Sequence, residues 1–283
     1  MRTAIALLIA VFALSSAFEE GHTWTWSGIQ PPPTSDDVEL TILDSWTVTW
    51  ASQALGLDVV EDGTDQTVIF ADQISDAVNS LDPDAGSAGS ISFPLYGPNN
   101  YCFGIAWGED SSQTEYCSDD WSASDVYYTE DLVDWTAYTN PLGGNGRGMA
   151  FDGTDWWIAG SSGSNTAVCR FEPGGSSELF GLPEIPTQLS GLAAYPYDGD
   201  IYLAVTAYKT YSIYFYVYDG SSVSFLASAP CPVGCSSSLG LAYSQDRGTL
   251  FWSYSSGSYT ICELSVEFTD LSEDTWGSIK SSF

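Results

Sequence analysis

A short motif recurs five times along the chain at nearly even spacing. Each copy is a glycine followed by Leu, Ile or Met, then usually a small residue and an aromatic or apolar one. Self-similarity at a period of roughly 20–50 residues is the signature of repeat architectures, so this feature constrains the fold more than any other. The copies are 43 to 49 residues apart and begin at Gly56, Gly104, Gly148, Gly191 and Gly240.

Each unit of the repeat is predicted to contain four short β-strands. A turn of Asp and Gly follows the first strand, as at residues 152–155, and these residues tolerate the positive φ angles of tight hairpins. Three further segments rich in β-branched and aromatic residues follow, as at 156–159, 167–171 and 178–180. Four strands in roughly 40–50 residues is typical of a propeller blade. We therefore expect an all-β fold, a five-bladed β-propeller of four-stranded antiparallel blades.

The repeat leaves two structural questions open. Six blades are the alternative if the N-terminal strands build another blade, and a solenoid would also show evenly spaced β repeats. The closure of the ring is open as well. Residues 46–50 could supply the fourth strand of the last blade and lock the ring, but residues 275–279 could supply that strand instead.

The N-terminus has the features of a secretory signal peptide. A single Arg2 precedes an apolar run that ends at Leu14, and small residues precede a cleavage site after Ala17. The run is shorter than the roughly 20 residues of a membrane span, although an uncleaved anchor is the alternative. We expect a secreted or cell-surface protein, extracellular or periplasmic, with no membrane insertion after cleavage. The predicted organisation is a signal peptide over 1–17, an N-terminal leader over 18–45 and a β-propeller over 46–283.

The charge balance narrows the choice of partners. The chain has 6 Lys and Arg against 37 Asp and Glu, a net charge of −31. Such a surface repels phosphate backbones and anionic lipids, so we expect no nucleic acid partner. Cations, neutral sugars and basic proteins remain, and solubility is the simpler explanation of the charge. Aromatic residues make up 14% of the chain, which indicates a folded protein rather than a disordered one.

Four of the six cysteines are predicted to form two disulfides, which fits an exported protein. Cys102 and Cys117 flank an expected hairpin, and Cys231 and Cys235 close a tight loop. The remaining two, Cys169 and Cys262, occupy equivalent positions in non-adjacent repeats.

Equivalent positions in non-adjacent blades are too far apart for a disulfide. Cys169 and Cys262 are therefore expected to be small buried hydrophobic residues. A zinc site is not expected, because the cysteines lack paired C-x-x-C spacing and the single histidine, His22, lies before the repeats.

One face of the predicted disc collects candidates for ligand binding. In a blade, the loops from the fourth strand to the next first strand and from the second strand to the third lie on the same face, and loops carry function more often than strands. Here they hold aromatic, amide and basic residues, which suits the stacking and hydrogen bonding of sugars. The alternative is that Arg147 offsets acidic loops while Trp121 and Tyr211 pack between blades. The candidate ligand-binding residues are Trp121, Arg147, Asn165, Lys209, Tyr211 and Tyr259.

Asp58 breaks the repeat, because the other four copies have Ala at its position on the innermost strand. A carboxylate there could be catalytic, could bind a cation, or could bond backbone groups where the first blade meets the last. Hydrolysis of a glycoside needs two carboxylates roughly 5–10 Å apart, and the repeat positions offer no second one. Asp58 is thus the only catalytic candidate, and the sequence favours a protein that is not an enzyme.

Two acidic turns are candidates for calcium. Asp62 and Asp65 in one turn, and Asp82 and Asp84 in another, place carboxylates close together, as oxygen-ligated sites require. Neither turn is a complete EF-hand loop, and metal-free Asp/Gly turns are much commoner. No cofactor is predicted, with calcium as the alternative.

The second unit contains the segment Thr129-Glu-Asp-Leu-Val-Asp-Trp135. It resembles the Ser/Thr-x-Asp-Leu-x-x-Trp turn of five-bladed furanosidases and, loosely, the Asp-box of sialidases. In those families the motif is a structural hairpin, so the resemblance implies the fold more than an activity. More broadly, residues 46–280 resemble secreted bacterial β-propellers.

These observations predict a non-catalytic extracellular propeller that binds a glycan or a protein ligand through one face of the disc. A glycosidase-like carbohydrate-active enzyme is one alternative, which Asp58 and the turn at 129–135 would support. A structural protein of the cell envelope, without a small ligand, is the other.

Overall fold

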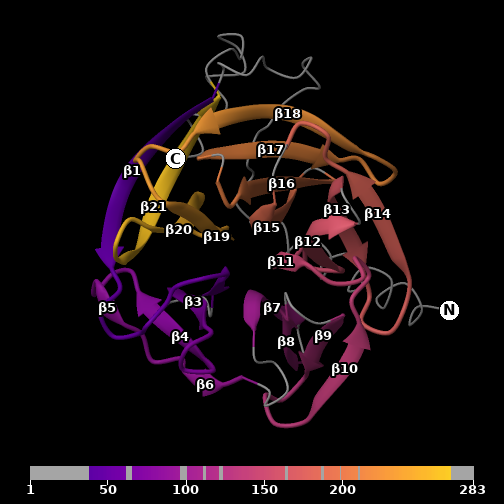
Figure 1. Ribbon diagram of the computed structural model, residues 1–283, viewed down its shortest axis with the longest axis horizontal. Coiled ribbons are helices and arrows are strands. Elements are labelled where there is room, and N and C mark those ends of the chain that lie inside the picture. The colour runs from indigo at the N-terminus through magenta and orange to yellow at the C-terminus, as the bar shows by residue number, and fades with distance from the viewer. Residues whose placement is uncertain are drawn as a thin grey trace, which may run out of the picture. The chain divides into compact units, whose positions relative to one another are not determined.

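The described part of the chain belongs to one compact unit, residues 30–270. Its strands form five antiparallel sheets around a central axis (Figure 1). The predicted five-bladed β-propeller is therefore confirmed, and the described residues form five blades rather than the alternative of six. No helix among the described residues has the length and apolar character to cross a membrane. The computed structural model describes residues 38–61, 66–95, 101–110, 113–120, 124–162, 165–185, 188–197, 199–209 and 211–268.

Within a blade, successive strands run from the centre of the ring to its edge (Figure 1). Blade one comprises β2 (Leu57–Glu61), β3 (Gln66–Asp72) and β4 (Ala77–Asp82), with the short strands β5 (Ser87–Ala88) and β6 (Phe93–Pro94) both paired to β4. Blade two comprises β7 (Cys102–Asp110), β8 (Gln113–Asp120), β9 (Asp125–Thr129) and β10 (Trp135–Thr139). Blade three comprises β11 (Gly146–Phe151), β12 (Trp156–Ser162), β13 (Asn165–Phe171) and β14 (Ser177–Gly181). Blade four comprises β15 (Leu189–Tyr197), β16 (Asp200–Ala207), β17 (Ser212–Tyr218) and β18 (Val223–Pro230). Blade five comprises β19 (Ser237–Ser244), β20 (Thr249–Ser255), β21 (Tyr259–Phe268) and, at its edge, β1 (Val38–Thr47).

The N-terminal strand β1 completes the last blade. It pairs with β21 in antiparallel register, from Val38 opposite Phe268 to Thr47 opposite Thr260. The strand begins upstream of the propeller boundary expected at residue 46, because residues 38–42 also pair with β21. Residues 1–17 and 275–279, for which the sequence predicted a signal peptide and another closing strand, lie outside the described residues.

The five repeat glycines form a ring of close backbone contacts at the centre of the propeller. A Cβ atom on Gly56 would lie 2.2 Å from the carbonyl oxygen of Phe103 in blade two, closer than any real contact. The same approach to the next blade recurs at Gly104, Gly148, Gly191 and Gly240. The repeat therefore starts with glycine because the inner strands of neighbouring blades come closest there, and a side chain would push them apart.

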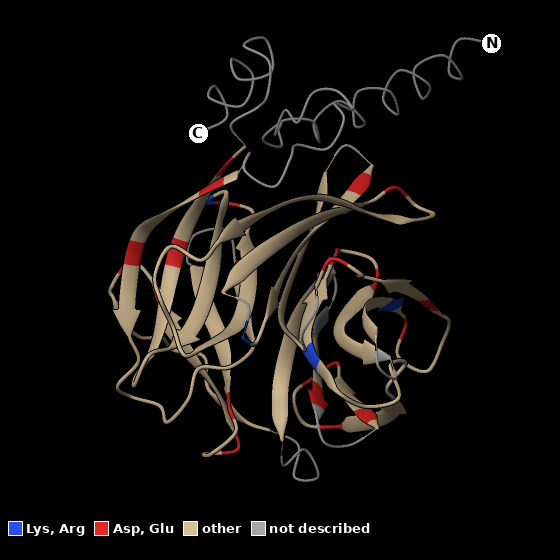
Figure 2. Ribbon diagram, turned by 45° about the horizontal axis from the view of Figure 1, so that its top comes forward, with Lys and Arg blue, Asp and Glu red and all other residues tan. Residues whose placement is uncertain are grey.

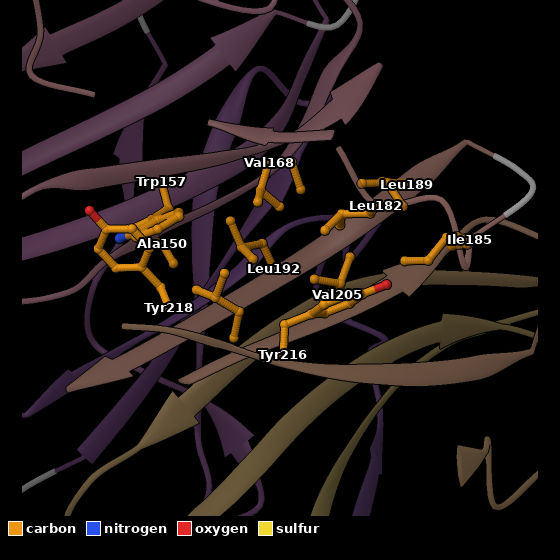
Figure 3. Close-up of a cluster of buried hydrophobic side chains, with 13 residues drawn as sticks. Ala150, Trp157, Val168, Leu182, Ile185, Leu189, Leu192, Val205, Tyr216 and Tyr218 are labelled. Carbon is orange, nitrogen blue, oxygen red and sulfur yellow. The ribbon is translucent and has the colours of Figure 1, made fainter. Parts of the chain in front are cut away.

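Large aromatic and aliphatic side chains fill the space between blades three and four (Figure 3). Trp157 of blade three is fully buried, and its ring lies 5.3 Å from that of Tyr218 of blade four, at an interplanar angle of 73°. Edge-to-face pairs of this kind add about 0.5–1.5 kcal/mol to the gain from burial. Val168 of β13 and Leu192 of β15 belong to the same cluster. Packing between blades thus supplies much of the core.

The two predicted disulfides are not formed, since no cysteine is bonded to another. Cys102 and Cys117 do lie on neighbouring strands, but Cys102 is opposite Asp120 while Cys117 is opposite Ala106. The offset follows from the position of the hairpin turn. The last pair before the turn is Asp110 opposite Gln113, so Cys102 lies eight residues before this pair and Cys117 only four residues after it.

The other cysteines differ in burial. Cys231 and Cys235 are partly exposed in the loop between β18 and β19, and burial raises the pKa of the Cys231 thiol to about 12. Cys169 and Cys262 are buried, as predicted, and burial raises the pKa of each to about 11. These two thiols behave as small core residues.

Candidate functional site

A pocket of about 400 Å³ lies at the end of the central channel where the inner strands begin. This is the face on which the sequence predicted a binding site. All five blades contribute to its walls, so the pocket is a property of the closed ring rather than of one blade. Its lining residues are Gln53, Leu55, Gln73, Phe103, Arg147, Gln188, Tyr208, Ser237, Leu239, Ser255 and Tyr259.

The lining is rich in amides and aromatic rings. Three glutamines and two tyrosines face the pocket with Phe103 and Arg147, and none of the described lining residues is Asp, Glu, His or Cys. The Gln53 side-chain amide donates a hydrogen bond of 3.3 Å to the hydroxyl of Tyr259, which orients both groups. Amides and phenols can donate to and accept from hydroxyl groups, so the pocket suits a polar, uncharged or anionic ligand.

Arg147 is the one charged residue among the described residues that line this pocket. It is mostly buried on β11, and its guanidinium carbon lies 5.4 Å from the ring centre of Phe103 and 5.6 Å from that of Tyr208. Burial lowers the pKa of Arg147, whereas the charge of Asp119 raises it. Because an arginine loses its proton only at very high pH, the guanidinium stays cationic. The two rings hold it in place through cation–π contacts.

Asp119 lies behind Arg147 rather than in the pocket wall. It is fully buried on β8, and its Oδ1 accepts hydrogen bonds from the backbone N–H groups of Phe103 and Gly104, at 3.3 and 2.7 Å. The carboxylate therefore fixes the backbone that leads into the pocket and offsets part of the charge of Arg147.

The structure brings together some of the predicted ligand-binding residues. Arg147 and Tyr259 line the pocket, and the Nζ of Lys209 lies 5.5 Å from the ring centre of Tyr208. Tyr211 is 43% exposed on the loop between β16 and β17, but neither it nor the exposed Asn165 is part of the lining. Trp121 lies outside the described residues.

Most of the lining was missed by sequence reasoning, although the repeat contains the signal. The residue three places before a repeat glycine lines the pocket in three of the five units, as Gln53, Gln188 and Ser237. The residue one place before the glycine lines it in four, as Leu55, Phe103, Arg147 and Leu239. Aligning these flanking positions would have located the pocket.

A second pocket, of about 240 Å³, lies at the other end of the inner strands and is lined by Asp58, Glu61 and Asp152 among aromatic residues. The carboxylate of Asp58 accepts hydrogen bonds from the backbone N–H groups of Val59, at 2.8 Å, and Trp107, at 2.6 Å. Burial raises the pKa of Asp58 to about 7. Asp58 thus accepts hydrogen bonds from backbone groups, which was one of the three interpretations of this residue. The bonds link blade one to blade two, however, and not to the last blade.

Glu61 makes the corresponding link to blade five. Its Oε1 accepts hydrogen bonds from the hydroxyl of Ser244, at 2.7 Å, and from the backbone N–H of Asp246, at 3.2 Å. Burial raises its pKa. Asp152 accepts a hydrogen bond of 2.7 Å from the indole N–H of Trp157. All three carboxylates of this pocket are therefore bonded by groups of the protein itself.

The calcium candidates do not form a metal site in the described residues. Asp82 accepts hydrogen bonds from the backbone N–H groups of Asp84 and Ala85, at 3.0 and 2.9 Å, and Asp84 forms an ion pair with Arg247. Asp62 and Asp65 lie outside the described residues. Among those described, no three metal-binding side chains cluster together.

The turn at residues 129–135 is held by its own side chains. The Oδ1 of Asp131 accepts hydrogen bonds of 2.8 Å from the N–H groups of Val133 and Asp134, which lower the pKa of Asp131. The ring of Trp135 packs edge-on against Tyr116, 5.6 Å away. No residue of this turn lines either pocket.

No known family and no curated protein match the sequence. Among solved structures, a glutaminyl cyclase from Myxococcus xanthus is similar, with 13% identity and a TM-score of 0.55, covering 84% of this chain and 100% of that one. A virginiamycin B lyase from Staphylococcus aureus has 14% identity and a TM-score of 0.46, covering 83% and 75%. Regucalcin, a calcium-binding protein from Agrobacterium tumefaciens, has 11% identity and a TM-score of 0.45, covering 76% and 91%. The propeller neighbours thus include enzymes, but at these identities the likeness shows the fold alone.

Proposed function

We propose that the protein is an extracellular, non-catalytic binding protein that holds a glycan in the pocket around Arg147, Tyr208 and Tyr259. The observation that carries this proposal is the lining of that pocket, which combines amides, aromatic rings and one arginine. Aromatic faces can stack on sugar rings, and the amides can bond their hydroxyls. The export signal predicted at residues 1–17 supports an extracellular setting.

The size of the pocket favours a small ligand. A volume of about 400 Å³ lies toward the lower end of the range of roughly 300–1,000 Å³ that is usual for small-molecule sites. It is concave and lies at the mouth of a narrow channel, so it suits one or two sugar units. A protein partner would have to reach it with a single projecting side chain or loop.

The chemistry of the lining argues against catalysis at this pocket. Glycoside hydrolysis uses a pair of carboxylates as acid and as nucleophile or base. The described lining residues include no carboxylate, and Asp119 behind them is already bonded to two backbone N–H groups.

A glycan array probed with the secreted chain tests the proposal. We expect binding to a defined set of oligosaccharides, with about tenfold weaker binding in Gln188→Ala and in Tyr259→Ala, each of which removes a polar contact or a ring from the lining. Asn165→Ala is the matched control, because Asn165 is exposed on the same face but outside the pocket. Absence of binding above background, or equal binding by all three variants, would contradict the proposal.

A second candidate function is a glycosidase at the opposite pocket. The pKa of Asp58, about 7, favours it, because a general acid is most effective when its pKa is near the working pH. The hydrogen bonds that Asp58 and Glu61 already make count against it. Release of sugar from a furanoside or sialoside panel that disappears in Asp58→Asn would favour this enzyme over a binding protein.

A further inference from the structure

The second pocket, of about 240 Å³, is built by one repeated position of the blades. In each of the five blades, the residue three places after the repeat glycine lines it. Most of these side chains are aromatic, so the walls of the pocket are largely formed by rings. The five residues are Val59, Trp107, Phe151, Ala194 and Tyr243.

Tyr195 adds a further aromatic ring to this wall. It follows the repeated position on β15, and its ring stacks on that of Tyr243, with the ring centres 4.1 Å apart and an interplanar angle of 24°. The aromatic side chains of the lining are only partly buried, so part of each stays accessible to a ligand. The face of an aromatic ring carries negative potential and attracts cations. These walls therefore suit a ligand that is both apolar and positively charged.

Two carboxylates of this pocket have no cation beside them among the described residues. Asp58 and Glu61 accept hydrogen bonds from backbone N–H and hydroxyl groups, but neither forms an ion pair with a described Lys or Arg. Asp152 differs, because Arg170 lies 3.6 Å from it and offsets its charge. Hydrogen bonds from neutral groups bring no positive charge. The charges of Asp58 and Glu61 therefore repel each other, and a bound cation would relieve this repulsion.

Acidic residues alone do not distinguish this pocket from the rest of the surface. The chain has 37 Asp and Glu against 6 Lys and Arg, and Figure 2 shows acidic residues in many parts of the fold. The distinguishing feature is that the carboxylates lie among aromatic rings. A metal ion needs several oxygen ligands, which rings do not supply, and no three metal-binding side chains cluster among the described residues. An alkylated ammonium ion needs only negative charge and apolar contact.

We propose that this pocket binds a small organic cation, an alkylated ammonium ion whose carbon groups pack on the aromatic rings and whose charge is balanced by Asp58 and Glu61. Aromatic walls are the usual means by which proteins recognise quaternary ammonium groups. The volume of about 240 Å³ is below the roughly 300 Å³ at which most small-molecule sites begin, so a compact head group fits it best. The proposal does not depend on glycan binding, which concerns the pocket around Arg147.

Calorimetric titration of the purified protein with choline tests this proposal. The matched control ligand is the neutral carbon analogue of choline, in which a tert-butyl group replaces the trimethylammonium group, so it reports packing without charge. We expect choline to bind at least about tenfold more tightly than the analogue. Equal affinities would show a merely apolar pocket, and no binding of choline at about 10 mM would show no cation site. Either result overturns the proposal.

Charge variants locate the site. Glu61→Gln keeps an acceptor oxygen and the shape of the side chain but removes its charge. We expect it to weaken choline binding by about threefold to tenfold and to leave the neutral analogue unaffected. Asp134→Asn removes one charge from an exposed turn of another blade and should change neither affinity. Equal effects of the two substitutions would reduce the preference for choline to the net charge of the protein, which overturns the proposal.

Ring variants test the aromatic wall. Tyr243→Phe keeps the ring and should retain choline binding, whereas Tyr243→Leu should weaken choline more than its neutral analogue, with thermal melts to show that both variants are folded. The comparison of the two ligands on the parent protein decides the matter even where Tyr243→Leu does not fold. A preference for choline that survives in both Glu61→Gln and folded Tyr243→Leu would place the cation elsewhere. Displacement of choline by calcium would assign the pocket to a metal ion, and both outcomes overturn the proposal.

Discussion

The hydroxyl of Ser253 donates a hydrogen bond of 2.7 Å to the carbonyl oxygen of Leu55, across the junction where the last blade meets the first. The same hydroxyl accepts a hydrogen bond of 2.8 Å from the backbone N–H of Gly240. Thr206 makes the equivalent bond to Leu239, at 3.1 Å, between blades four and five. Buried hydroxyls on the second strand of a blade thus satisfy the backbone groups beside the repeat glycines.

Replacing Ser253 by alanine should weaken the closure of the ring. The variant leaves a buried carbonyl and a buried N–H without their partner, which costs about 1–3 kcal/mol for each group left unsatisfied. We expect urea denaturation to show a free energy of unfolding lower by at least about 1 kcal/mol. Ser258→Ala in the exposed turn of the same blade is the control and should leave stability unchanged. Equal stability of the two variants would contradict this account of the junction.

The closing strand β1 should stabilise the propeller through Trp46. This side chain is buried, and its ring stacks on that of Phe251, 6.2 Å away. Trp46→Ala is expected to lower the free energy of unfolding by about 3–5 kcal/mol, the usual cost of removing a large aromatic residue from a core. Leu43→Ala, on the same strand but 54% exposed, should change it little. Thermal melts of the two variants provide the comparison, and similar melting temperatures would argue against closure by β1.

The repeat glycines should not tolerate a side chain. A Cβ atom at Gly240 would lie 2.3 Å from the carbonyl oxygen of Leu55, so Gly240→Ala must separate the two inner strands. Overpacking of this kind costs about 1–3 kcal/mol, and we expect a drop of at least that size in a denaturant titration. Gly181→Ala is the matched control, because no atom lies within 4 Å of the position of its Cβ. The prediction fails if both alanine variants keep the stability of the parent protein.

Asp58 should make the stability of the protein depend on pH. Burial raises its pKa from 3.8 to about 7, so the folded state binds this proton more tightly than the unfolded chain does. The stabilisation from this group is full below about pH 4 and is lost as the pH rises through 7. Three pKa units correspond to about 4 kcal/mol. Because the side chain is only partly buried, we expect the free energy of unfolding to fall by about 1–2 kcal/mol between pH 5 and 8.

Urea denaturation at several pH values checks this expectation. Asp58→Asn removes the titrating group, so its stability should fall less than that of the parent protein between pH 5 and 8. Asp134→Asn, at an exposed position of another blade, should follow the parent curve. Parallel pH profiles for the parent and Asp58→Asn would rule out a raised pKa at Asp58.

The repeat was readable from the sequence because every blade meets the same steric requirement at the same position. Gly56 and its four equivalents are glycines because the backbones of neighbouring blades touch there. A glycine therefore recurs at this position in every blade, where it can be seen in the sequence. The register between β7 and β8 has no comparable signal in the sequence. Cys102 and Cys117 are offset because the last pair before the hairpin turn is Asp110 opposite Gln113, and the spacing of the cysteines does not show where the turn lies.

The pocket was only partly predictable, because most of its lining residues become significant only when the five blades bring them together. Arg147 and Tyr259 attracted attention because of their residue types, and both line it. Gln53 and Gln188 are unremarkable as single residues, and their role comes from the convergence of five loops on one channel mouth. Asp58 was conspicuous as a break in the pattern, but its partner, the N–H of Trp107, belongs to the backbone and has no sequence signal.

The pairing of β1 with β21 also bears on the order in which the protein can fold. Val38 and Phe268 lie at opposite ends of the described chain, yet they face each other in one blade. During synthesis the first of these strands emerges long before its partner exists, so blade five stays incomplete until nearly the whole chain has been made. Contacts of such high sequence separation slow folding, because a long loop must close before they form. The ring therefore cannot close until β21 has been synthesised, whatever the order in which the other blades form.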